Sequence, residues 1–221
     1  MKKTIALLLA FILVVGVTIG GTIAWLTAQT PEVKNTFTVG DIGIELWEHK
    51  LNPDNDKELT NETVPSNEYN YVPGDTLPKD PFVTVKAGSE ACWLFINVTE
   101  DNNGLPDSTA GEKIISWTVA EGWTQVDNHN VWYKEVDAAT AKTGESWYIL
   151  AGDTVAEGAT QKYPNGCVTV NTAVTKDMVT TINADKPTLT FDAYAHQSAN
   201  TTLEAAKAAA LTHFGITTPT T

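Results

Sequence analysis

The chain has 221 residues and a formal net charge of −13 at pH 7, and all 14 of its basic residues are lysines. The absence of arginine argues against phosphate or nucleic-acid recognition, in which bidentate guanidinium contacts are the usual device. A strongly acidic surface suits a protein that must stay soluble outside the cell.

The first 24 residues have the pattern of a secretory signal peptide. Lys2 and Lys3 form a short positive region, and an apolar run at residues 5–19 follows it. Small residues then lead up to Ala24, so we predict cleavage between Ala24 and Trp25. Cleavage would remove two lysines and no acidic residue, so the charge of −13 would become −15.

Two alternatives remain at this end of the chain. A second candidate cut lies after Ala28. An uncleaved anchor is the other alternative, because residues 5–26 carry no charge and are long enough to span a bilayer. We expect membrane contact only through this uncleaved segment. The remaining chain is long enough to bury one sizeable core.

Short runs rich in β-branched and aromatic residues follow, separated by Gly, Pro, Asn and Asp. They predict strands at residues 35–48, 81–86, 92–100, 113–119, 123–126, 131–136, 146–150, 166–171, 178–183 and 188–196. Many short strands without alternating helices predict an all-β fold, either a sandwich or a jelly roll. Period-2 alternation predicts that Cys92, Leu94, Ile96 and Val98 face a core.

The first predicted strand contains a change of phase. Phe37 and Val39 are odd-numbered, whereas Ile42, Ile44 and Leu46 are even-numbered. A regular strand cannot send both sets to one face, because a slip of one residue flips every side chain. We therefore predict a bulge or sharp bend at Gly40 and Asp41.

One helix is predicted near the C-terminus. Thr201 and Glu204 fit a capping box, and the sequence LEAAKAAALTHF that begins at Leu203 has high helix propensity. Gly215 suits the position just past the helix end, and residues 216–221 read as a flexible tail. Earlier in the chain, Pro73, Gly74 and Asp75 predict a tight loop.

Two cysteines, Cys92 and Cys167, allow either a disulfide, which an exported protein can form, or two buried thiols. The sequence contains no H-E-x-x-H pattern, nucleophile elbow or phosphate loop, so we predict no catalytic residue, no metal site and no cofactor. Asp54, Asp56 and Glu58 resemble the opening of a calcium loop, but the remaining EF-hand ligands do not follow, which favours a solvated acidic loop.

Seven tryptophans also need an explanation, and those in or beside predicted strands include Trp93, Trp117, Trp123, Trp132 and Trp147. A core or subunit contact is the ordinary reason for large aromatic area in a β protein. A platform on which sugars stack is the alternative.

Three blocks of sequence carry a resemblance to a known family. They are the leader end with NTFTVGDIGIELWE (residues 20–48), the block around YVPGDTLPKDPFVTVKA (71–98) and AYAHQSANTTLEAAKAAAL (193–211). In this order they resemble the TasA/camelysin family, most of all its BsaA-like branch. Residues from about 100 to 185 carry no part of the resemblance.

The resemblance implies a secreted biofilm-matrix protein of Gram-positive bacteria, processed by a SipW-type signal peptidase. It implies four parts: a signal peptide at 1–24, a donor segment at 25–34, a jelly-roll domain at 35–215 and a tail at 216–221. The donor segment would complete a sheet of the next subunit, giving a head-to-tail homopolymer. Its proposed pairing residues are Trp25, Leu26, Thr27, Ala28, Gln29, Thr30 and Val33.

Elementary chemistry supports such an assembly, because an exposed sheet edge has unpaired N–H and C=O groups that an extended peptide can satisfy. A head-to-tail contact that does not close produces a filament. Pro31 lacks an N–H, so pairing should stop at Thr30 or resume at Glu32.

Two other functions stay open. Some camelysin-like relatives are described as metalloendopeptidases, but this chain shows no ligand set for that activity. The third candidate is a monomeric adhesin that binds glycans through its aromatic residues.

Overall fold

The computed structural model describes residues 41–156 and 158–217, and this part of the chain is mostly β structure with a short C-terminal helix. The prediction of an antiparallel β protein that ends in one short helix is confirmed at this level. The elements are β1 (Ile44–Asn52), β2 (Asn55–Val64), β3 (Thr76–Pro78), β4 (Phe82–Val85), β5 (Cys92–Asp101), β6 (Ile115–Ser116), β7 (Thr124–Gln125), β8 (Val131–Val136), α2 (Ala138–Thr143), β9 (Glu145–Tyr148), β10 (Cys167–Val170), a 3₁₀ turn (Lys176–Met178), α3 (Val179–Ala184), β11 (Thr188–Gln197) and α4 (Leu203–His213).

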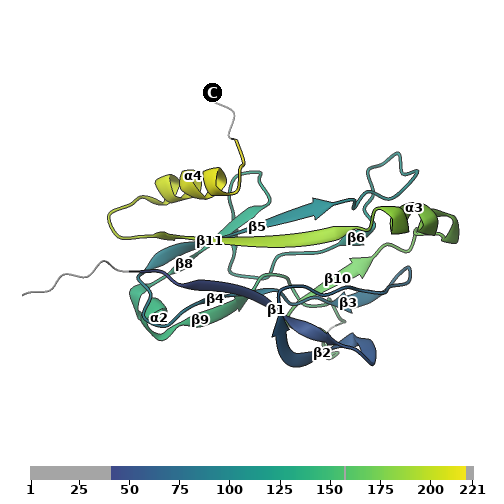
Figure 1. The fold of residues 1–221 in the computed structure, drawn as a ribbon, viewed down its shortest axis with the longest axis horizontal. Coiled ribbons are helices and arrows are strands. Elements are labelled where there is room, and N and C mark those ends of the chain that lie inside the picture. The colour runs from purple at the N-terminus through teal and green to yellow at the C-terminus, as the bar shows by residue number, and fades with distance from the viewer. Residues whose placement is uncertain (1–40, 157, 218–221) are drawn as a thin grey trace, which may run out of the picture. The chain divides into compact units, whose positions relative to one another are not determined.

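The described strands form three antiparallel sheets (Figure 1). The β1 sheet has the order β2-β1-β4-β9, and the β11 sheet has the order β11-β5-β8-β7. A smaller sheet, β3-β10-β6, lies beside them. The β1 and β11 sheets face each other as two layers, and the main hydrophobic cluster combines residues from both.

The predicted alternation along β5 is confirmed. Cys92, Leu94, Ile96 and Val98 are all at most 1% exposed and belong to the main cluster, with Val83 of β4 in the facing sheet. On β11, the odd-numbered Leu189, Phe191, Ala193 and Ala195 pack against the same cluster.

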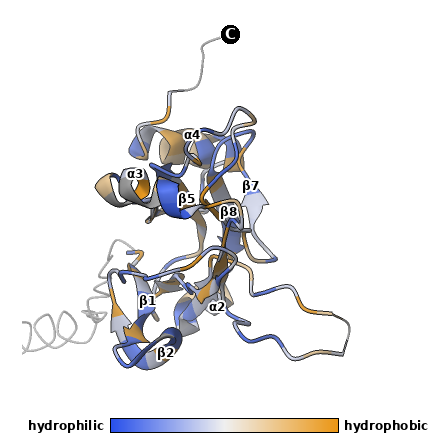
Figure 2. Ribbon diagram, turned by 90° about the vertical axis from the view of Figure 1, so that its right-hand side faces the viewer, coloured by the Kyte–Doolittle hydropathy of each residue, from blue (hydrophilic) through white to orange (hydrophobic). Residues whose placement is uncertain are grey.

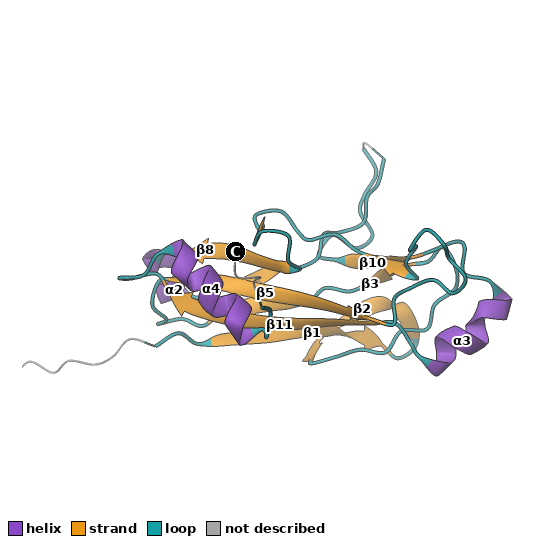
Figure 3. Ribbon diagram, turned by 90° about the horizontal axis from the view of Figure 1, so that it is seen from above, coloured by secondary structure: helices purple, strands orange, loops and turns teal. Residues whose placement is uncertain are grey.

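The other face of the β11 sheet is also covered. Helix α4 lies across β11 and β5 (Figure 3), above the layer that contains β1 and β2 (Figure 2). Phe95 of β5 is fully buried there against Ala206, Ala210 and Leu211 of the helix. This helix therefore closes one face of the sheet and leaves the edges of the sheet uncovered.

Strand β1 begins at Ile44, and the described residues 41–43 before it are not part of a strand, whereas residues 35–40 of the predicted strand lie outside the described part. Ile42, Ile44 and Leu46 do share a face, because all three pack against the main cluster. Asp41 precedes the strand, and its Oδ1 accepts a hydrogen bond from the Ile42 N–H. The predicted bend at Gly40 and Asp41 can be followed only from Asp41 onward.

Two strand predictions are wrong or too long. Residues 178–183 form the end of a 3₁₀ turn and helix α3, although Thr and Ile favour strands, and Ile182 is buried in the main cluster. Such propensity is overridden easily by packing. Residues 113–119 form only the two-residue β6, because the Asn103 side chain takes both the N–H and the C=O of Ile115.

Three elements of the described chain were not predicted from the sequence: β2, β3 and α2. Strand β2 contains the charged stretch NDKELTNETV, which reads as a solvated loop but pairs with the second half of β1 through a tight turn. Helix α2 has one turn and a half and is capped by Asp137, whose side chain accepts from the Thr140 N–H. Strand β3 has three residues and pairs with β10. All three elements are short or polar, so their sequences alone do not indicate them.

Helix α4 begins one residue later than the predicted capping box implies. Thr202, not Thr201, is the N-cap, and its hydroxyl accepts from the Ala205 N–H. Glu204 pairs with Lys207 instead of reaching back to the cap. Gly215 has a φ of +70° directly after the C-cap Phe214, as a helix-ending glycine should.

Candidate functional sites

The outer edge of β11 carries backbone groups that no described strand uses. The register pairs Gln197 with Cys92, and the Ser198 N–H bonds to the Ala91 carbonyl, which continues that register. Alternate residues of an antiparallel strand bond to the same neighbour. The backbone N–H and C=O groups of the even-numbered residues of β11 therefore bond to β5. The backbone N–H and C=O groups of the odd-numbered residues point away from β5. We call these the open edge of β11: Leu189, Phe191, Ala193, Ala195 and Gln197.

In the described part of the chain, β11 is the last strand of its sheet, so this edge has no strand partner there. It extends over a ten-residue strand, whereas the opposite edge strand, β7, has two residues. One of its donors, the Ala193 N–H, is taken by the Asp192 carboxylate at 2.8 Å. An exposed strand of this length is a template on which another extended chain can pair.

A second unpaired edge lies next to it, on the first half of β1. The Lys86 N–H bonds to the Gly43 carbonyl, so odd-numbered residues of β1 bond to β4. The backbone N–H and C=O groups of Ile44 and Leu46 point away from β4. Among the described strands, β2 pairs with β1 on that side only from Glu48 onward. Strands β1 and β11 lie close together in space, yet no ladder joins them in the described part (Figure 1).

The side chains along these two edges are apolar and only partly covered. We call them the β1–β11 seam, and its members are Ile42, Ile44, Leu46, Leu189 and Phe191. All five pack against the main cluster but keep an intermediate exposure. A further strand laid along the seam would bury them and satisfy the backbone groups of the open edge.

A buried ion pair lies at one end of the seam. Lys79 and Glu48 are 9% and 4% exposed, and their Nζ and Oε2 atoms are 2.7 Å apart. The Lys79 Nζ also lies 5.5 Å from the centre of the Phe191 ring and 5.4 Å from that of Tyr69. Burial, followed by the charges of Glu48 and Asp80, raises the pKa of Tyr69 strongly. This charged cluster joins β1, the β3–β4 segment and β11.

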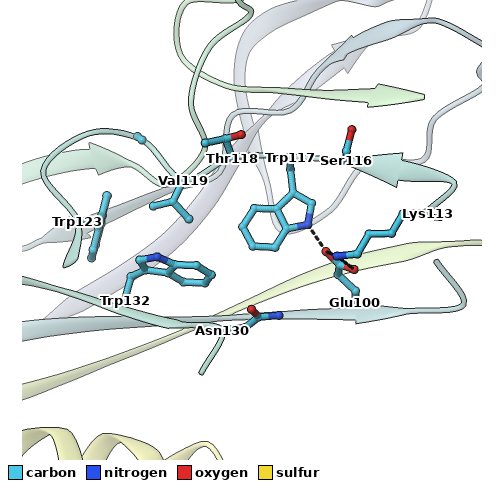
Figure 4. A pocket seen from close by; sticks show the side chains of 10 residues that line it. Glu100, Lys113, Ser116, Trp117, Thr118, Val119, Trp123, Asn130 and Trp132 are labelled. Carbon is cyan, nitrogen blue, oxygen red and sulfur yellow. Dashed lines mark hydrogen bonds and ion pairs between the residues drawn. The ribbon is translucent and has the colours of Figure 1, made fainter. Parts of the chain in front are cut away.

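A different surface, the aromatic groove, lies between β5, β8 and the segment that follows β6 (Figure 4). It is a cavity of about 510 Å³ that is open to solvent. Three partly exposed indoles line it, and Trp117 and Trp132 meet edge to face with their ring centres 5.6 Å apart. Its lining includes Trp117, Trp123, Trp132, Glu100, Asn130 and Thr118.

Glu100 is the charged group that holds one side of the groove. Its carboxylate accepts hydrogen bonds from the Trp117 Nε1, the Asn103 amide and the Lys113 ammonium. Burial by itself would raise the pKa of Glu100, but the bonds from Lys113, Asn103 and Trp117 outweigh it and hold the pKa below its ordinary value of 4.5. The carboxylate therefore stays ionised at neutral pH and orients the Trp117 ring.

The hydrogen bonds to the Glu100 carboxylate make a contribution to the free energy of unfolding that depends on pH. Because the pKa of Glu100 is lowered by folding, its stabilisation is complete above 4.5 and is lost as the pH falls through the lower, folded value. We expect Glu100→Gln to lower the free energy of unfolding by about 1–3 kcal/mol at pH 7. The difference from the parent should shrink as the pH falls below the ordinary value of 4.5, in urea unfolding measured from pH 7 to pH 3. A constant difference over that range would contradict the assignment.

The sequence-predicted cleavage and donor residues lie outside the described residues. These are Ala24 and Trp25 at the cut, and Trp25, Leu26, Thr27, Ala28, Gln29, Thr30 and Val33 in the donor segment. The Pro73 loop is described and is a β-turn: the Asp75 N–H bonds to the Val72 carbonyl, and Gly74 has a φ of +84°. That positive φ explains the glycine.

Cys92 and Cys167 are both free and buried, and they lie on strands of different sheets. The disulfide that the sequence left open is therefore not formed in this structure. Burial raises the pKa of the Cys92 thiol to about 11 and, together with the charge of Asp153, raises that of Cys167. Both thiols are protonated at neutral pH, which is typical of inert core cysteines.

Within the described residues, no group of three or more His, Cys, Asp and Glu side chains is placed to hold a metal ion. His49 instead bonds to the buried Asp80 through its Nδ1, at 2.7 Å. No helix within residues 41–156 and 158–217 has the length and apolar character needed to cross a membrane.

No family model, curated protein or solved structure matches this chain.

Sequence analysis did not find the open edge, the buried ion pair or the groove. Glu100, Trp117 and Trp132 are far apart in sequence and belong to three segments, so no local spacing connects them. The excess of tryptophan was the one available indication, and it pointed equally to a core.

Proposed function

We propose that this chain is a secreted structural protein of a biofilm matrix or cell surface, which polymerises into fibres by donating its N-terminal segment to the next subunit. The domain would be a jelly roll whose open side receives the donor. The open edge of β11 is the observation that carries the proposal, since it combines a row of backbone groups that no described strand uses with a partly exposed apolar seam.

The donor in this proposal is the segment that a SipW-type signal peptidase would release, residues 25–34, from another copy of the chain. Trp25 and Val33 are apolar enough for burial in the seam to contribute about 2 kcal/mol each, before ordering costs are subtracted. A run from Trp25 to Thr30 can pair before Pro31 interrupts the ladder. The contact is head to tail, so repetition gives a filament.

No catalytic group is part of this function. The histidines and acids that lie together, such as His49 with Asp80, are paired within the fold at a buried position. We propose no enzyme activity, cofactor or nucleic-acid partner; the partners are other copies of the chain and the processing peptidase.

Deletion of residues 25–34 from the secreted chain tests the proposal. We expect a folded monomer, judged by circular dichroism and thermal melting, that forms no fibres by negative-stain electron microscopy. A synthetic peptide of residues 25–34 should bind this truncated monomer, since its open edge is vacant. Fibres formed by the truncated chain would refute the donor assignment.

A further inference from the structure

We propose that the aromatic groove binds a neutral oligosaccharide. The groove shares no lining residue with the open edge of β11, although Glu100 of β5, which lines the groove, is the register partner of Leu189.

The groove is built from residues that a core would ordinarily bury. Trp132 of β8 pairs with Ile96 of β5, so its side chain lies on the core-facing side of the sheet. Strand β7 adds only Thr124 and Gln125 beyond β8, so the sheet ends there among the described residues and Trp132 keeps an intermediate exposure. The volume of about 510 Å³ is within the range of small-ligand sites, about 300–1,000 Å³.

Side-chain chemistry selects the class of ligand. The indoles of Trp117, Trp123 and Trp132 come from three segments and converge on one hollow, as Figure 4 shows. Sugars with equatorial hydroxyls have flat C–H faces that stack on such rings, and their hydroxyls need donors and acceptors at the rim. Asn130 and Thr118 are exposed and supply those groups.

Charge excludes the acidic saccharides. The Glu100 carboxylate lies in the groove wall, and its Lys113 partner, 2.7 Å away, neutralises rather than reverses its charge. The whole chain is strongly acidic as well, so a uronic-acid polymer would be repelled. A neutral hexose or N-acetylhexosamine chain meets no such barrier.

Isothermal titration with the full secreted chain at pH 7 tests this proposal. The probes are cellohexaose, the hexamer of N-acetylglucosamine and, as the acidic comparison, polygalacturonate. We expect at least one neutral hexamer to bind and polygalacturonate not to bind. Trp117→Ala should weaken binding about tenfold, and Asn130→Ala, which changes an exposed side chain, about threefold.

Trp93→Ala is the matched control, since Trp93 is a partly buried indole on the opposite face of the same sheet, near α4. It should change the affinity by less than about twofold. Failure of both neutral hexamers to bind would overturn the proposal, and so would equal losses in the Trp117 and Trp93 variants. Loss of fibres in Trp117→Ala with saccharide binding intact would identify the groove as an assembly contact instead.

Discussion

Replacing Ala195 with proline should abolish fibre formation and leave the monomer folded. Ala195 belongs to the open edge of β11, so its N–H points away from β5 and supports no bond of the described fold. Proline removes that donor, and its ring occupies the space where a donor strand would lie. Proline is tolerated at such positions of edge strands.

Two matched prolines separate an assembly effect from an unfolding effect. Tyr194→Pro is one residue away, but the Tyr194 N–H belongs to the ladder with Phe95, so this variant should unfold at a clearly lower temperature. Ser146→Pro changes β9, an edge strand of the β1 sheet, at a position whose N–H also points outward. It should leave both the fold and the fibres intact.

Electron microscopy and analytical ultracentrifugation measure assembly, and thermal melting by circular dichroism measures folding. Fibres of normal length from Ala195→Pro would show that the open edge is not the receiving edge. Loss of fibres in Ser146→Pro alone would move the contact to the β1 sheet. Fibre formation by donor pairing is therefore expected to need the open edge of β11.

Replacing Lys79 with methionine should destabilise the fold by about 3–5 kcal/mol, because Glu48 would remain as a buried carboxylate without its cation. Breaking one partner of a buried pair leaves a desolvation cost with no compensating attraction. The double variant Glu48→Leu with Lys79→Met should recover most of the loss, since apolar groups of similar size are often as stable as a buried ion pair.

The pair formed by Lys86 and Glu45 provides the control. Its atoms are 2.6 Å apart, but its side chains are 53% and 44% exposed. Lys86→Met should therefore change the free energy of unfolding by less than about 1 kcal/mol. Urea unfolding at pH 7 measures all three variants against the parent protein. If Lys79→Met and Lys86→Met lower the free energy of unfolding equally, burial does not determine how much the pair of Lys79 and Glu48 contributes to stability.

The pattern of the sequence was a good guide wherever local chemistry decides the structure. Alternation identified the core face of β5, because the period of two in side-chain direction belongs to the strand itself. Gly215 was identified as the residue after α4, because its positive φ is a local requirement. The even-numbered residues of β1 were placed on one face for the same reason as those of β5.

Other features depended on partners that are far away in the chain. Residues 113–119 have strand composition, but the side chain of Asn103 replaces a strand partner at Ile115. The charged β2 became a strand because β1 supplies a ladder for it. Residues 178–183 became helix α3, since Ile182 packs into the main cluster from a helix.

The sequence by itself determined the class of this protein: short antiparallel strands, one capped C-terminal helix and an acidic surface without arginine. Only the tertiary structure decided which edges stay unpaired, that Glu48 and Lys79 meet in the interior, and that three tryptophans line one groove. The physical reason is that side-chain direction and turn geometry are local, whereas edge exposure, desolvation and cavity shape depend on which segments the fold brings together.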